Sequence, residues 1–414
     1  MLEFIATYYG VLLIPFISAI IGWGTNVLAL KMTFYPIEFI GFEIKGVNAV
    51  GWAGLPPLGW QGIVPSKALK MASMSTDMIT SKLIDVEEQF ALINPKIVAK
   101  ELEPSMLRLA RQVTDEVMTK YVPMWKILPT KTKESVYEKA ALEIPFVIEQ
   151  IMVDVKTNIT EVFDLKKMVI DFLMQNKELM NRIFLEVGDK EFQFIERSGF
   201  GFGFLFGLIQ ALIYFNYPEQ AWWQLPLGGL VVGYLTNVLA LKMIFSPVNP
   251  INLFGYKIQG LFIKRQKEVA RGYSKLISDN IMTMDNVFTE MFNGAGADRL
   301  VGIIEKHAQQ GVDKTAGFNS SLIKLTSGTN TYEEIKKTAI NRFIDAAPEQ
   351  VNLVFGYAKQ ALDVEETLFH KMSTLPPDDF VNFLRPVFQE DEWKLIGIGA
   401  LLGMVAGFLQ LLLL

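Results

Sequence analysis

One twelve-residue stretch of this chain occurs twice. The stretch Thr25-Asn-Val-Leu-Ala-Leu-Lys-Met-Thr-Phe-Tyr-Pro36 recurs 211 positions later as Thr236-Asn-Val-Leu-Ala-Leu-Lys-Met-Ile-Phe-Ser-Pro247, with ten of twelve residues identical. Gly22 and Gly233 precede the two copies at the same offset. Chance is a poor explanation for such a match, so the sequence predicts an internal duplication.

A second pair of matching segments marks the far end of each copy. The spacing of Gly203, Gly207 and Gln210 is repeated by Gly403, Gly407 and Gln410. We therefore expect a tandem duplication, with repeat one at residues 1–216 and repeat two at residues 217–414.

Four apolar segments are long enough to cross a bilayer, which takes about 20 helical residues. They lie at about residues 8–31, 199–215, 225–242 and 395–414. Each repeat is then one span, a polar domain and a second span. The predicted fold class is mainly α, a polytopic membrane protein made of two such repeats.

The cations of the chain predict its orientation. No Lys or Arg occurs before Lys31, between Arg197 and Lys242, or after Lys394. The positive-inside rule therefore places residues 34–197 and 246–393 in the cytosol and both termini outside, in a cell membrane. Both repeats then enter the membrane from the same side, so the repeats are parallel.

The cytosolic domains are predicted to be amphipathic helices. Apolar residues recur at helical spacing through both domains, and breaks are expected at Pro95, Pro123, Pro129 and Asp164. A last helix of repeat one is expected from Leu165 to Val187. We expect a mobile loop at residues 317–332, which are rich in Ser, Thr, Asn and Gly. Residues 34–64, which include Trp52 and Trp60, are expected either at the headgroup level of the membrane or packed under the domain.

Composition excludes several classes of function. The net charge is −5 with both signs mixed through the polar stretches, which argues against nucleic-acid binding. The chain has no Cys and only two His, and no nucleotide-binding or hydrolase motif is present. We therefore expect no enzymatic activity, no catalytic residues, no cofactor and no metal site.

The candidate functional residues are polar side chains within or beside the spans. Thr25 and Asn26, with Thr236 and Asn237, either line a polar site between the repeats or hold helices together, since lipid offers an amide no partner. We expect Asn26 and Asn237 to bind each other across a central axis. Gln210 and Gln410 have the same two interpretations. A lipid headgroup site, or a simple membrane anchor, is predicted at four cations, Lys264, Arg265, Lys267 and Arg271.

The paired Gly-x-x-Thr-Asn-x-x-Ala-x-x-Met-x-Phe-x-Pro blocks and residues 59–66 resemble the family of domain of unknown function 445, the YheB-like membrane proteins. This resemblance implies a membrane location and no particular reaction. Repeat two departs from the pattern, because Gln259-Gly-Leu-Phe-Ile-Lys-Arg265 lacks the proline of residues 59–66.

Two functions remain open from the sequence. The first is a membrane-anchored scaffold that binds membrane lipids, a protein partner or a second copy of itself. The alternative is a small transporter or channel with a polar site between the repeats.

Overall fold

The chain is almost entirely helical and forms two compact units. The computed structural model describes residues 2–41, 59–253, 255–327, 329–389 and 392–413. Unit 1 consists of Met1–Met78, Ile170–Lys275 and Phe369–Leu414, and unit 2 consists of Ile79–Val169 and Leu276–Leu368. Each unit therefore takes segments from both predicted repeats. The compact units therefore differ from the sequence repeats. A chain with two sequence repeats can still fold into units that combine segments of both.

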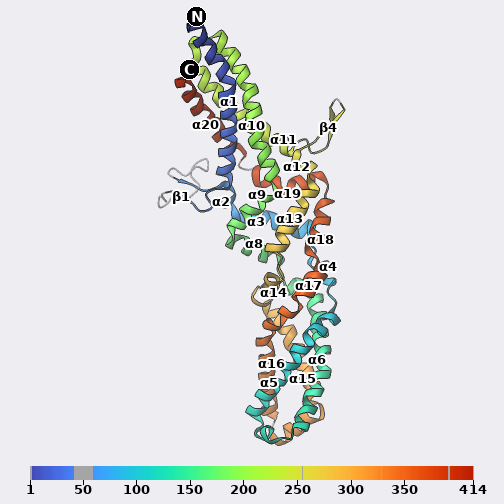
Figure 1. Ribbon diagram of the computed structural model, residues 1–414. Coiled ribbons are helices and arrows are strands. Elements are labelled where there is room, and N and C mark those ends of the chain that lie inside the picture. The colour runs from blue at the N-terminus through green and yellow to red at the C-terminus, as the bar shows by residue number, and fades with distance from the viewer. Residues whose placement is uncertain (1, 42–58, 254, 328, 390–391, 414) are drawn as a thin grey trace. The chain divides into compact units, whose positions relative to one another are not determined.

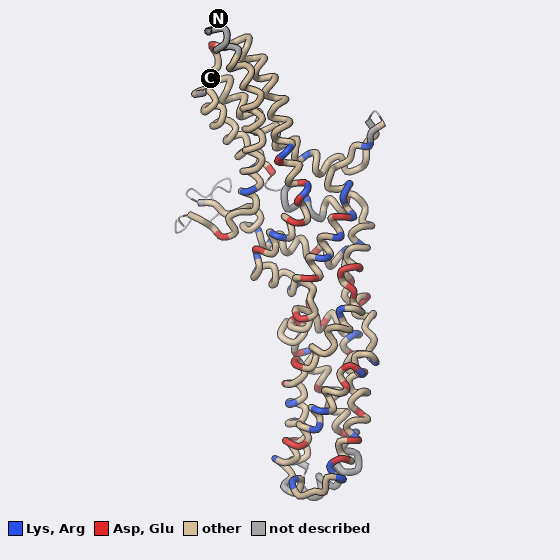
Figure 2. Tube along the Cα trace, in the orientation of Figure 1, with Lys and Arg blue, Asp and Glu red and all other residues tan. Residues whose placement is uncertain are grey.

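The core of unit 1 is formed by four long apolar helices: α1 (Leu2–Phe34), α10 (Asp189–Asn216), α11 (Ala221–Phe245) and α20 (Glu392–Leu413). All four are long and apolar enough to cross a membrane. Figure 1 shows them side by side, with the start of α1 and the end of α20 at the same end of the bundle. In Figure 2 they are almost free of charged residues, whereas both signs recur along the helices of unit 2. The four predicted spans thus correspond to four helices of suitable length.

Glycines bring these helices together in two pairs. On α1 and α10, the backbones approach so closely that a Cβ on Gly22 would collide with the carbonyl of Gly199. On α11 and α20, a Cβ on Gly233 would collide with the carbonyl of Gly399 in the same way. Small residues permit this close approach, and van der Waals contact between backbones drives helix association in membranes. The glycine spacing seen in the sequence is therefore a packing device.

Short elements follow the first helix of each pair. After α1 come β1 (Ile40–Gly41), β2 (Gly59–Trp60), α2 (Ile63–Ser66) and α3 (Ala68–Met78). After α11 come β3 (Ile251–Leu253), β4 (Tyr256–Ile258), α12 (Leu261–Lys264) and α13 (Gln266–Asn280). In both places the strands pair antiparallel. Trp60 donates a hydrogen bond to the Met32 carbonyl at 3.2 Å, while Trp52 lies outside the described residues.

Five further helical elements lie in unit 1, and two of them continue into unit 2. They are η4 (Pro218–Gln220), α9 (Lys177–Val187) and α19 (Pro377–Gln389), with α8 (Leu165–Gln175) and α18 (Val364–Ser373) containing boundaries between the units. The chain between Leu165 and Val187 is thus two helices, and the predicted single helix is wrong. Asn176 separates them.

Unit 2 is a bundle of long and short helices. Its long helices are α5 (Pro95–Tyr121), α6 (Thr130–Thr157), α15 (Ala297–Ser327) and α16 (Thr329–Val351). Its short elements are a π-helical turn at Ile79–Leu83, α4 (Val86–Ala91), η3 (Pro123–Ile127), α7 (Ile159–Val162), α14 (Met284–Asn293), η5 (Asn352–Val354) and α17 (Phe355–Leu362).

Local signals explain several of these boundaries. Pro95 occupies the first turn of α5, where it loses no helical hydrogen bond, and the Asn94 side chain caps that helix by accepting from the Lys96 amide. Pro123 begins a 3₁₀ turn, and Pro129 directly precedes α6. The predicted breaks at these prolines are confirmed.

The predicted loop at residues 317–332 is wrong. Helix α15 continues to Ser327 and α16 begins at Thr329. Intrinsic preference is a weak predictor that tertiary context overrides, and here α15 and α16 pack against each other.

Candidate functional site

The two membrane asparagines bind the backbone of a neighbouring helix. Asn26 on α1 donates to the Ile195 carbonyl of α10 at 2.7 Å, and Asn237 on α11 donates to the Leu395 carbonyl of α20 at 3.1 Å. Gly199 lies four residues after Ile195, and Gly399 lies four residues after Leu395. Each asparagine amide packs against one of these glycines, which have no side chain to cover the carbonyl that accepts the bond. The expected bond between Asn26 and Asn237 is therefore wrong.

The neighbouring threonines bind their own helices. Thr25 donates to the Gly22 carbonyl at 3.1 Å, and Thr236 lies 3.4 Å from the Gly233 carbonyl. Both residues are buried. All four Thr and Asn side chains thus direct their donors to helix backbones within the bundle.

The two glutamines differ between the helix pairs. Gln210 accepts a hydrogen bond from the Ser18 hydroxyl at 3.0 Å. Gln410 is 1% exposed, and neither of its side-chain polar atoms has a hydrogen-bond partner among the described residues. The sequence offset of 211 places Gly229, which has no hydroxyl, where repeat one has Ser18. The second copy therefore lacks the donor that the first one uses.

The predicted basic cluster is divided by the structure. Arg265 Nη1 lies 2.6 and 2.7 Å from the two Glu191 carboxylate oxygens, and Arg265 Nε lies 3.0 Å from Glu268. Lys190 also binds Glu268, at 2.8 Å. The hydrogen bond from Lys190, followed by the one from Arg265, lowers the pKa of Glu268. Arg265 is therefore held in an ion-pair network inside unit 1.

The other three cations of the cluster have different surroundings. The Arg271 guanidinium lies 3.5 Å from the centre of the Phe369 ring, an arrangement typical of cation–π contact. Lys264 and Lys267 are exposed. The structure does not bring all four cations to one site.

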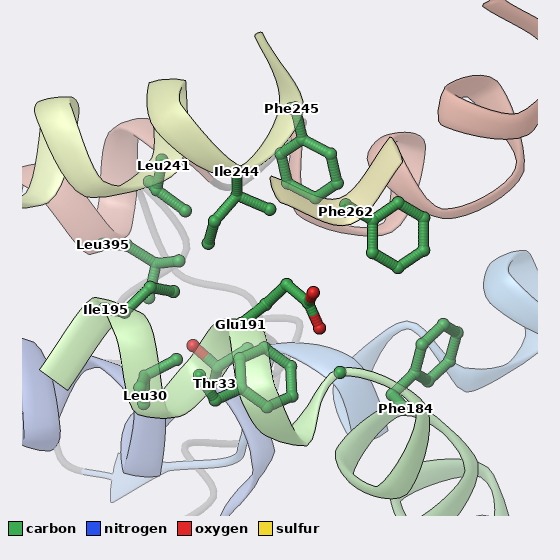
Figure 3. Close-up of a pocket in the computed structure, with 12 residues that line it drawn as sticks. Leu30, Thr33, Phe184, Glu191, Ile195, Leu241, Ile244, Phe245, Phe262 and Leu395 are labelled. Carbon is green, nitrogen blue, oxygen red and sulfur yellow. The ribbon is translucent and has the colours of Figure 1, made fainter. Parts of the chain in front are cut away.

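A small apolar pocket surrounds Glu191. Figure 3 shows its carboxylate projecting from α10 into this pocket, with Phe245 of α11 and Phe262 of α12 across from it. The cavity volume is about 30 Å³, enough for one or two water molecules. Glu191 is 3% exposed, and a buried carboxylate needs a charged partner, which Arg265 provides. This pocket is a structural junction and is too small for a larger ligand.

A much larger cavity lies within unit 2. Its volume is about 350 Å³, and it is lined mainly by α5, α6, α14, α15 and α16. The lining is almost entirely aliphatic and aromatic, and includes Met106, Val113, Ile144, Ile151, Ile304 and Ile335. Sites of this volume and lining are typical of small apolar ligands.

Two of the polar side chains on this lining, Glu143 and Tyr332, are paired. Glu143 lies 3.7 Å from Lys314, and the Tyr332 hydroxyl donates to Asp313 at 3.1 Å. Burial, followed by the Asp313 carboxylate, raises the pKa of Tyr332 to about 12, so the phenol is neutral at physiological pH. Lys336 binds the same carboxylate at 2.6 Å. Among the described residues that line the cavity, Glu143 is the one Asp, Glu, Lys or Arg. Such a lining suits an uncharged ligand.

His307 and its neighbour Lys306 share one carboxylate partner. His307 Nε2 and Lys306 Nζ each lie 2.8 Å from Asp154 Oδ2. The hydrogen bond from Lys306, followed by the one from His307, lowers the pKa of Asp154. Within the described ranges, no three His, Cys, Asp or Glu side chains are grouped as metal ligands would be.

The cavity was missed from the sequence, although a signal for it exists. The apolar faces of its helices carry small residues, including Ala140, Ala308, Gly311 and Ala339, between larger ones. Small side chains on a buried face leave volume unfilled when no larger side chain from the facing helix compensates. Whether one does depends on how the helices are paired.

Comparison with known proteins gives relatives that are named only as membrane proteins. A UPF0754 membrane protein of Synechococcus sp. (strain JA-2-3B'a(2-13)) is 30% identical over 157 residues, and that match covers 33% of this chain and 38% of the relative. A second, from Synechococcus sp. (strain JA-3-3Ab), is 29% identical over 185 residues, covering 38% of this chain and 44% of the relative. One from Staphylococcus aureus (strain JH9) is 26% identical over 122 residues, covering 28% of this chain and 32% of the relative.

The matches thus span less than half of each relative. No family model and no solved structure matches the chain. The relatives carry the UPF0754 name and not the label of domain of unknown function 445. Their names and the four apolar helices place this chain in a membrane, among relatives without an assigned activity.

Proposed function

We propose that this protein is a membrane-anchored lipid-binding protein whose unit 2 holds an apolar chain between α5, α6, α14, α15 and α16. The observation that carries the proposal is the apolar cavity of about 350 Å³ in that bundle. The protein would bind its ligand without chemical change, and no cofactor is involved in the proposal.

The energy of an empty cavity supports a ligand. Apolar surface that faces water is unfavourable, and covering it with an apolar ligand is favourable in proportion to the area removed from water. Water does not compensate, because an aliphatic lining offers it few hydrogen bonds. An acyl or other aliphatic chain would restore the lost contacts.

The apolar helices of unit 1 would anchor the lipid-binding unit 2 to a membrane. We propose that α1, α10, α11 and α20 all cross a cell membrane and that unit 2 is cytosolic, as the positions of the cations predict. The matching asparagine bonds of the two helix pairs support the proposed tandem duplication. We also propose that the chain is related to the family of domain of unknown function 445, which its paired Thr-Asn blocks resemble. Membrane lipids are the proposed partners, and a protein partner or second copy remains a secondary proposal.

The alternative is a transporter or channel between the repeats. Such a pathway needs polar groups that face a solute. Asn26 and Asn237 donate to the backbone of an adjacent helix, and Gln210 accepts from Ser18. These contacts favour a packing role, so the lipid-binding proposal has the stronger support.

The cavity can be tested by filling it. Ala308 lines the cavity on α15, whereas Gln310 on the same helix is exposed, so Ala308→Phe and Gln310→Phe form a matched pair. Binding of a fluorescent long-chain alkanol to the purified full chain should weaken on the order of tenfold in Ala308→Phe, because the ring takes the ligand's space. The same variant should unfold at a higher temperature, since it fills a void.

Gln310→Phe should change neither binding nor melting temperature. Mass spectrometry of the protein purified in mild detergent should also find a bound lipid. Equal alkanol binding by Ala308→Phe and the unchanged protein would refute the cavity as the binding site.

A further inference from the structure

A third cavity lies in unit 1 at the end of α11. Its volume is about 210 Å³, and three charged side chains line it together with apolar ones. The apolar side is made by Val238, Leu241 and Phe245, which belong to the last turns of the apolar helix α11. The polar side is made by side chains at the end of that helix and by α19 and α20.

The polar side combines charges of both signs. Lys242 lies in the last turn of α11, and Ser246 directly follows that helix. Arg385 comes from α19, and Glu392 begins α20. Lys242 is exposed, while Arg385 and Glu392 are half-buried. Within the part of the chain that the structure describes, none of these three is in an ion pair, unlike Arg265 in its network with Glu191 and Glu268. Two cations, a hydroxyl and a carboxylate therefore face one cavity with their charges available.

The position of the cavity indicates what could occupy it. Lys242 lies in the last turn of one candidate span, and Glu392 is the first residue of another. Residues at such helix ends lie at the level of lipid headgroups, where a polar site adjoins the hydrocarbon. A ligand here meets both charged groups and the apolar surface of α11.

We propose that this cavity binds the headgroup of a phospholipid that carries both a phosphate and a primary ammonium group. The phosphate pairs with Lys242 and Arg385, and the ammonium pairs with Glu392. The Ser246 hydroxyl donates to a phosphate oxygen, and an acyl chain lies along Val238 and Leu241. This site is separate from the apolar cavity of unit 2, and neither proposal depends on the other.

The carboxylate decides the class of headgroup. A lipid with a phosphate and no amine would satisfy the two cations but leave Glu392 beside a second negative charge, which is unfavourable. With a phosphate and an ammonium group, the single phosphate charge lies between Lys242 and Arg385, and Glu392 gains an opposite charge of its own. A quaternary ammonium cannot donate a hydrogen bond to Glu392, so a primary amine is favoured, because charge-assisted hydrogen bonds are the stronger contacts.

The test compares three probes on the full chain in mild detergent, with binding measured by native mass spectrometry. The probes are dioctanoyl phosphatidylethanolamine, dioctanoyl phosphatidylglycerol and inorganic phosphate. We expect the ethanolamine lipid to bind most tightly. Arg385→Gln should weaken it on the order of tenfold, because a hydrogen bond between charged groups is lost. Arg385→Lys should retain most of the affinity.

Glu392→Gln should abolish the preference for ethanolamine over glycerol. Lys264→Gln, which removes an exposed lysine outside this cavity, is the matched control and should change nothing. The melting temperature of each variant, followed by circular dichroism, should stay close to that of the unchanged protein, which reports that the variants are folded.

Three outcomes would overturn the proposal. The first is equal binding of both lipids with no effect of Glu392→Gln, which would mean that the carboxylate does not distinguish the two headgroups. The second is inorganic phosphate binding as tightly as the lipid and with the same sensitivity to Arg385→Gln, which would make this a site for free phosphate. The third is lipid binding that no variant changes.

Discussion

Glycine at two residues decides what the membrane asparagines bind. Gly199 and Gly399 leave a backbone carbonyl uncovered one turn earlier, and the amides of Asn26 and Asn237 reach those carbonyls. An amide in a lipid environment has to find a partner within the protein. Here the partner is the backbone of the paired helix, so each asparagine belongs to one helix pair.

This arrangement predicts that the two asparagines act independently. Asn26→Leu and Asn237→Leu should each lower the free energy of unfolding by about 1 kcal/mol, as for other interhelical hydrogen bonds in membranes. The double variant should equal the sum of the two within about 0.5 kcal/mol, because the residues share no partner. Equilibrium unfolding in mixed micelles measures all three variants. Coupling of about 1 kcal/mol or more between the two sites would contradict separate pairing.

At the scale of elements, long helices of unit 2 are joined by a few charged contacts. Asp154 on α6 accepts from Lys306 and lies against His307, both on α15. The same two helices line the apolar cavity. The contact of Asp154 with α15 therefore helps to hold α6 and α15 together beside the apolar cavity.

The Asp154 contact predicts a dependence of stability on pH. Its folded-state pKa is lowered from the ordinary value of 3.8, chiefly by Lys306. A lowered carboxyl pKa contributes stability that is complete above the unfolded value and is lost as the pH falls through the folded one. Asp154→Asn should therefore melt below the unchanged protein at about pH 6, with the difference narrowing below about pH 4.

Thermal unfolding followed by circular dichroism measures this difference. Lys306→Met should reproduce part of the Asp154→Asn effect, because Lys306 is the larger cause of the lowered pKa. A constant gap between Asp154→Asn and the unchanged protein at every pH would show that the Asp154 charge is not what stabilises the contact.

At the scale of the whole molecule, the proposed orientation puts the connection between α10 and α11 on the opposite side of the membrane from unit 2. The cation-free segment around Glu219 lies in that connection, whereas Lys337 belongs to α16 of unit 2. Both residues are exposed. The positive-inside rule makes the Lys337 side cytosolic.

Single cysteines test this orientation well, because the chain has no cysteine of its own. A membrane-impermeant maleimide should label Glu219→Cys on intact cells and Lys337→Cys only after permeabilisation. Labelling of both variants on intact cells would contradict the four-span arrangement. Labelling of Lys337→Cys alone would reverse the orientation.

Features that depend on local composition and periodicity could be predicted from the amino-acid sequence. The four apolar helices, the helix breaks at Pro95, Pro123 and Pro129, and the glycine rows that permit close packing could all be read from single segments. Hydropathy and backbone preference act within a segment, so no knowledge of its neighbours was needed.

Which segments contact one another follows from the three-dimensional fold. It set the partner of Asn26, placed Arg265 in an ion pair with Glu191, and joined α15 to α16 through residues that resembled a loop. It also left a cavity in unit 2 that no single helix encodes. The physical reason is that a hydrogen-bond partner or a void depends on the facing helix, which lies more than 100 positions away for Asn26 and Ile195.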